Sequence, residues 1–151
     1  MSGLGLYGRV LGVDLGSRRI GVAVSDSARS LATGVTVIPR NPDRPSDHKV
    51  LADLVERYEA TAVVVGLPLS LSGRTGPAAA AVLEEVEQIR QTLNVPVDTV
   101  DERFSTVVAS GALRDAGRPS RRRREVVDAV AASVLLQGWL DAAKLREDAR
   151  R

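Results

Sequence analysis

Three acidic residues stand where the sequence makes a carboxylate either costly or well placed for chemistry. Asp14 lies inside the apolar stretch VLGVDL, Glu102 lies just past another apolar-rich segment in VDERFST, and Asp128 lies within VVDAVAASVLL. Burying an ionised carboxylate is unfavourable unless it is paired or bound to a metal. Clusters of carboxylates hold Mg²⁺ or Mn²⁺ through oxygen atoms alone. The three residues are therefore candidate catalytic groups and metal ligands.

Each acid also has a simpler explanation when it is considered alone. Asp14 could bond the backbone amides of a turn, Glu102 could favour the N-terminus of a following helix, and Asp128 could pair with an arginine one helical turn away. The chain contains no cysteine and only one histidine, His48. Any metal must therefore bind through oxygen, which favours Mg²⁺ or Mn²⁺ over zinc. Whether one ion or two would be bound stays open.

Positive charge is concentrated near two of these acids. Residues 103–124 contain seven arginines and one acid, Asp115, although the formal net charge of the whole chain is only +2. A local basic patch on a nearly neutral chain favours a polyanion such as nucleic acid, and a solvated helix face is the alternative. The candidate nucleic-acid contacts here are Arg103, Ser105, Thr106, Arg121, Arg122 and Arg124. Arg18 and Arg19, which follow Asp14, could extend the patch or could simply be solvated.

Two further features give weaker signals. The segment LPLSLSGRTGP (67–77) offers Arg74 and exposed amides at a predicted helix start, which suits a phosphate, but it lacks the Gly-Lys-Ser/Thr ending of a P-loop. Trp139 has leucines beside it and is expected to pack within a helix. With an aromatic content of 3%, base stacking is not expected to drive binding.

The elements that must position these residues can be predicted from periodicity and turn signals. The predicted strands are Arg9–Leu15, 18–25, 31–39, 62–66 and 95–100. The predicted helices are 46–60, 77–93, 104–115 and 120–144, with the last residues frayed. Early hairpin strands followed by strand–helix units predict an α/β fold with a mixed five-stranded sheet and helices on both faces.

This arrangement puts Asp14 on a central strand, Glu102 at a strand end and Asp128 on the last helix. The core stripe of that helix is expected to be Val126, Val127, Val130 and Val134. Asp128 would lie beside this stripe, where Ala131 and Ala132 leave room for the sheet and a hydrated ion.

Length and hydropathy set broader expectations. The 151 residues, 44% of them hydrophobic, predict a single domain over 1–151. No apolar run reaches the roughly 18 residues of a membrane span, and the N-terminus lacks the layout of a signal peptide. A cytoplasmic protein without a membrane partner is expected.

Four segments together resemble the YqgF family, also called RuvX, of bacterial Holliday-junction resolvases and pre-16S rRNA nucleases. They are GVDLGSRRIGVAVSD (12–26), VVVGLPLSLSGRTG (63–76), DERFST (101–106) and VDAVAASVLLQ (127–137). The resemblance implies a ribonuclease-H-like fold and metal-dependent phosphodiester cleavage, with the family's acids on Asp14, Glu102 and Asp128. Phe104 and Ser105 depart from the residues commonest after DER, which should affect packing more than chemistry.

The substrate and the rival functions stay open at this point. The expected partner is structured RNA or branched DNA, bound by a monomer or a homodimer; a resolvase that cuts two opposed strands would usually need a two-fold dimer. A factor associated with rRNA or transcription, with little or no catalysis on the same fold, is one alternative. An ATPase of the actin, Hsp70 and sugar-kinase class is disfavoured, because those proteins need two lobes and this length supplies one.

Overall fold

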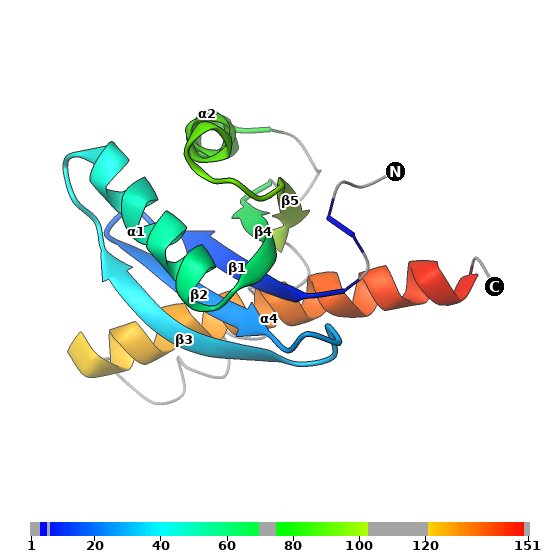
Figure 1. Ribbon diagram of the computed structural model, residues 1–151. Helices are drawn as coiled ribbons and strands as arrows, with labels where there is room; N and C mark the ends of the chain where they lie inside the picture. The colour runs from blue at the N-terminus through cyan, green and yellow to red at the C-terminus, as the bar shows by residue number, and fades with distance from the viewer. Residues whose placement is uncertain (1–3, 6, 70–74, 103–120, 150–151) are drawn as a thin grey trace.

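The computed structural model describes residues 4–5, 7–69, 75–102 and 121–149, with side chains in the last helix described from residue 127 onward. It contains one sheet of five strands and three helices in the described part (Figure 1). In chain order the elements are β1 (Arg9–Leu15), β2 (Arg19–Ser25), β3 (Ala32–Pro39), α1 (Arg44–Arg57), β4 (Ala60–Leu67), α2 (Pro77–Thr92), β5 (Val97–Asp101) and α4 (Arg121–Ala149). The helix predicted over 104–115 lies outside the described residues.

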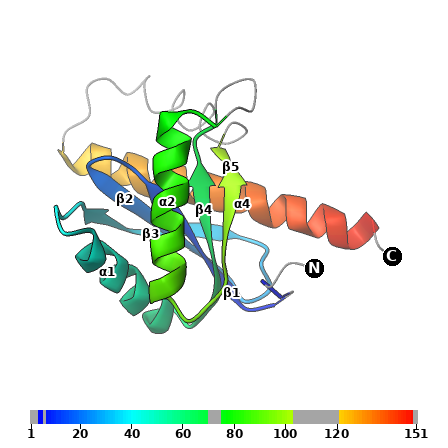
Figure 2. The same cartoon turned by 90° about the horizontal axis from the view of Figure 1, so that it is seen from above.

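The strand order β3-β2-β1-β4-β5 follows from the connections. Short links join β1, β2 and β3, so these strands pair antiparallel, whereas helices precede β4 and β5, so β1, β4 and β5 pair parallel. Helices α1 and α2 cover one face of the sheet and α4 crosses the other (Figures 1 and 2). The predicted mixed sheet with helices on both faces is confirmed.

Alternation along the strands divides the core into two layers. The layer beneath α1 and α2 includes Leu11, Val13, Ile20, Val22, Val63 and Val65 of the sheet and Leu51, Leu54, Val86 and Ile89 of the helices. The layer beneath α4 includes Val10, Ala23, Ala62, Val64, Ala132, Leu135, Leu136, Trp139 and Leu140. Trp139 therefore packs in the core, as the sequence indicated.

The buried stripe of α4 differs from the prediction. The buried residues are Ala132, Leu135, Leu136, Trp139 and Leu140, whereas Val127, Val130 and Val134 are only half-buried and the side chain of Val126 lies outside the described part. The sheet presents glycines to this helix, and a Cβ on Gly12 would come within 2.7 Å of the Leu136 Cβ. A glycine surface accepts alanine and backbone closely, so the Ala/Leu side of α4 gives the tighter contact. Asp128, one turn before Ala132, therefore faces the sheet.

Helix α4 also extends to Ala149, beyond its predicted end near residue 144. Its last turns contain alanine, leucine, lysine, arginine and glutamate without glycine or proline, and these are strong helix formers. No helix in the described ranges is long and apolar enough to cross a membrane.

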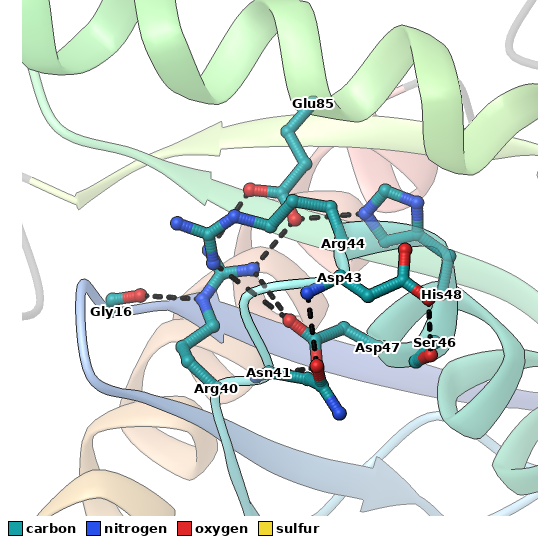
Figure 3. A network of polar contacts seen from close by, with 9 residues as sticks. All are labelled: Gly16, Arg40, Asn41, Asp43, Arg44, Ser46, Asp47, His48 and Glu85. Carbon is teal, nitrogen blue, oxygen red and sulfur yellow. Dashed lines mark hydrogen bonds and ion pairs between the residues drawn. The ribbon is translucent and has the colours of Figure 1, made fainter.

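A buried polar network fixes the turn between β1 and β2 (Figure 3). Arg40 donates from Nε to the Gly16 carbonyl oxygen at 2.9 Å, and its terminal nitrogens contact both carboxylate oxygens of Glu85 at 2.7 and 2.9 Å. Asp47 and His48 of α1 join the network, with His48 Nε2 2.8 Å from Glu85 Oε2. Burial alone would raise the pKa of Glu85, but the hydrogen bonds from Arg40 and His48 lower it. The network ties α1, α2 and β3 to the turn.

Candidate functional site

The period-two register of the strands places the candidate acids on the face that α4 covers. On β1, Val10 and Gly12 contact α4, and Asp14 is the next residue on that side. On β5, Val100 packs against the same core layer, so Glu102 follows it on that side. The structure therefore brings residues from β1, from the end of β5 and from α4 to the same region of the sheet.

Asp14 and Glu102 are hydrogen-bonded to each other through their side chains. Gly66 of β4 makes room for this contact, because a Cβ at that position would lie 2.5 Å from Glu102 Oε1. The Glu102 side chain thus lies over Gly66 of β4, the strand that stands between β5 and β1. Gly66 is not among the residues predicted from sequence, although its place on the α4 face could have been found by counting alternate residues from Ala62 and Val64.

The electrostatics of this pair favour a bound cation. Burial, followed by the hydrogen bond to Asp14 and the charges of Asp14 and Asp101, raises the pKa of Glu102 to about 8. Burial also raises the pKa of Asp14; the hydrogen bond to Glu102 opposes that rise, and the negative charge of Asp128 adds to it. The two carboxyl groups therefore retain a proton between them near neutral pH. A positive ion at the same place would remove the repulsion that keeps this proton bound.

Asp128 is paired with an arginine, but with a different one from those expected on its own helix. Its Oδ2 accepts a hydrogen bond from Arg19 Nε at 2.5 Å, and the two side chains are 25% and 28% exposed, respectively. The backbone carbonyl of Asp128 sits against Gly21, two residues beyond Arg19 on β2. Arg19 is thus half-buried and ion-paired with Asp128.

The donor set has the chemistry that Mg²⁺ or Mn²⁺ requires, because it offers only carboxylate oxygens at a half-buried position. The spacing fits two ligands better than three. In the described parts of the chain, no three acidic, histidine or cysteine side chains are spaced to hold one ion as they stand. Asp14 and Glu102 are hydrogen-bonded to each other. The charge of Asp128 raises the pKa of Asp14, but the Asp128 carboxylate is hydrogen-bonded to Arg19.

Of the other predicted nucleic-acid contacts, only Arg18 has a described side chain. Arg18 is exposed in the turn between β1 and β2, directly before β2 begins. Arg121, Arg122 and Arg124 lie in the first turns of α4, close in sequence to Asp128, but their side chains are not among those described. The remaining candidates, Arg74, Arg103, Ser105 and Thr106, lie outside the described residues.

A mixed sheet in this strand order, with acids converging beneath the last helix, defines a ribonuclease-H-like fold. RuvC of T. thermophilus, solved in complex with a Holliday junction substrate, has the same fold: the TM-score is 0.55 at 22% identity, covering 91% of this chain and 96% of that one. The model of the family described as "RuvX: Holliday junction resolvase" matches residues 8–142. The chain belongs to the RuvX family.

Curated relatives support the same assignment across most of the chain. A protein of Rhodococcus opacus (strain B4) is 46% identical over 138 residues, covering 89% of this chain and 78% of the relative. A protein of Myxococcus xanthus (strain DK1622) is 46% identical over 134 residues, covering 89% and 88%. Both are provisionally named pre-16S rRNA nucleases. The resemblance found in the sequence is confirmed, and the chain is a member of a nuclease family.

Proposed function

We propose that this protein is a divalent-metal-dependent nuclease that hydrolyses phosphodiester bonds near the 5′ end of precursor 16S rRNA, with Holliday-junction DNA as the competing substrate. The RNA substrate is preferred because relatives at 46% identity carry that name, whereas RuvC at 22% identity supports the fold alone. The cytoplasm is the expected location. A monomer suffices for processing one RNA end, while symmetric cutting of a junction would call for a two-fold dimer.

The observation that carries the proposal is the proton-sharing pair formed by Asp14 and Glu102, with Asp128 on the same face. These three side chains would hold Mg²⁺ or Mn²⁺. When bound, such an ion polarises the phosphate and lowers the pKa of a water molecule. Hydrolysis by water should leave 5′-phosphate and 3′-hydroxyl ends, and products that carry a 2′,3′-cyclic phosphate would contradict this chemistry.

The basic residues are proposed to position the substrate by contacting its phosphates. Arg18, Arg19, Arg74, Arg103, Ser105 and Thr106 are proposed to contact phosphates around the acids. Arg121, Arg122 and Arg124 precede Asp128 on α4, so contacts from them would place a backbone near the site. Replacing these three arginines should weaken binding and flatten its dependence on salt, because fewer phosphate contacts form and fewer counterions are released on binding. An unchanged salt slope would indicate that these arginines form a solvated helix face and do not contact phosphates.

The function can be tested with three substrates offered in parallel: a 5′-extended 16S precursor RNA, a four-way DNA junction and a linear DNA duplex. Each is incubated with Mn²⁺, with Mg²⁺ and with EDTA. Cleavage of the precursor with either metal, and with no cleavage in EDTA, supports the proposal. Preferential cutting of the junction would make the protein a resolvase, and equal cutting of all three would contradict both specific substrates.

One observation favours a second candidate, a binding factor with little or no catalysis. Asp128 is engaged by Arg19, and in the described residues no three acids are spaced to hold one ion, so the site is not assembled for a metal as it stands. Such a factor would bind the precursor RNA with the same affinity in the presence and absence of Mn²⁺ and would release no product with either metal. That result would favour the binding factor over the nuclease as the function of this protein.

A further inference from the structure

The contact between Arg19 and Asp128 uses only part of the arginine. Nε donates to Oδ2 at 2.5 Å, and among the described residues the two terminal nitrogens have no hydrogen-bond partner. A guanidinium presents its terminal nitrogens as a fork that matches the oxygens of a phosphate. Arg19 therefore holds Asp128 through Nε, and while this contact lasts the whole guanidinium group, including its fork, stays against the carboxylate.

A divalent ion and Arg19 would compete for the same carboxylate. The Asp128 charge is already close enough to affect Asp14, so an ion held by Asp14 and Glu102 would also attract Asp128. The same ion would repel the guanidinium. The two positive groups cannot both bind Asp128 at full strength.

The exchange would need little more than a side-chain rotation. Arg19 begins β2 and follows the turn that Arg40 clamps: the Arg40 backbone amide donates to the Arg18 carbonyl at 2.9 Å, and its Nε donates to Gly16. The backbone beneath Arg19 is thereby fixed. Its side chain is long and about one quarter exposed, so it can turn without moving the strand.

We propose, on the basis of the proposed function, that Arg19 is an exchangeable counter-ion. It neutralises Asp128 while the site holds no metal, and the entering ion takes over the carboxylate and releases the guanidinium fork to a substrate phosphate. Metal binding and nucleic-acid binding are then coupled through one side chain. Because such coupling is reciprocal, each ligand raises the affinity for the other by the same factor.

The test compares Arg19→Gln with Arg9→Gln, which removes the same charge from an exposed residue at the start of β1 that has no ion pair in the described structure. Mn²⁺ binding to EDTA-stripped protein is measured by calorimetry. Arg19→Gln should bind Mn²⁺ about tenfold more tightly than wild type, since a charge-assisted hydrogen bond that competes with the ion is lost. Arg9→Gln should stay within about twofold, because an exposed charge is largely screened.

A second readout follows the released fork. Affinity for precursor RNA is measured with and without Ca²⁺ as a probe ion for the same acids. The ion should raise the affinity of wild type severalfold and leave that of Arg19→Gln nearly unchanged. Arg19→Lys, which keeps the charge but loses the fork, should restore competition with Mn²⁺ and only part of the RNA response.

The inference is overturned if Arg19→Gln binds Mn²⁺ no more tightly than wild type, or if its RNA affinity responds to the ion as wild type does. This outcome is separate from failure of the proposed function, because cleavage is not part of either readout. If wild-type protein binds Mn²⁺ yet cuts no substrate, the proposed nuclease activity is contradicted and the proposed counter-ion exchange still stands. Thermal unfolding of each variant confirms that it is folded before titration.

Discussion

Replacing Glu102 by glutamine should stabilise the metal-free protein at alkaline pH. The pKa of Glu102 is raised from 4.5 to about 8, mainly by burial and by the hydrogen bond to Asp14. A carboxyl group with a raised pKa gives the folded state an advantage below its unfolded pKa, and that advantage disappears as the pH rises through the folded value. Glutamine does not titrate. The variant therefore keeps the folding stability that wild type loses as the pH rises from about 4.5 to about 8.

The size of the effect follows from the same interval. If the whole change in pKa acted on stability, it would be worth about 5 kcal/mol. Glu102 is only half-buried and shares its proton with Asp14, so solvent screening reduces the expected gain to about 1–2 kcal/mol. The site would then be an example of stability given up for function.

Urea unfolding in EDTA at about pH 5 and about pH 9 measures this difference directly. Glu102→Gln should match wild type at the lower pH and exceed it at the higher one. Glu84→Gln, at an exposed position on α2, is the control and should show no pH-dependent gain. A variant that is less stable than wild type at the higher pH, or whose difference from wild type is equal at both, would refute the reasoning.

Three further substitutions test the packing around the site and the polar network of Arg40. Gly66→Ala brings a Cβ against Leu135 Cδ1 and to 2.5 Å from Glu102 Oε1, so it should lower Mn²⁺ affinity and cost about 1–3 kcal/mol in urea unfolding. Gly12→Ala meets the Leu136 side chain first, away from the acids, and should cost stability without changing Mn²⁺ affinity. Equal loss of affinity in both variants would contradict the role given to Gly66. Arg40→Met removes the buried guanidinium that Asp47 and Glu85 share and leaves them only Arg44 and His48, so it should destabilise the protein by about 3 kcal/mol. Unfolding of this variant at the wild-type urea concentration would show that the network is dispensable.

Local periodicity was enough to predict most of the fold. The apolar run of β1, closed by Gly16, and the short links around β2 fixed the hairpins, and β4 was recognisable from its unbroken apolar run. The element order then left few topologies for a mixed sheet. The resemblance to one family across four segments supplied the expected fold directly.

The buried face of α4 could not be predicted from its own sequence. The helix carries valines on one side and alanine and leucine on another, so its pattern allows more than one core stripe. The choice depends on glycines of the sheet, such as Gly12 and Gly34, which are distant in sequence. The pair between Arg19 and Asp128 is non-local for the same reason, since 109 positions separate the two residues.

The most direct test of the central claim is the rate of precursor RNA cleavage in Mn²⁺ by Asp14→Asn, Glu102→Gln and Asp128→Asn, each compared with wild type and with Glu84→Gln. All three site variants should fold and bind RNA but cut at least about a hundredfold more slowly, since even residues behind metal ligands cost ten- to hundredfold when replaced. The exposed control should cut at the wild-type rate. Near-wild-type cutting by any one of the three, or undiminished cutting in EDTA, would contradict the claim that these acids hold a catalytic metal.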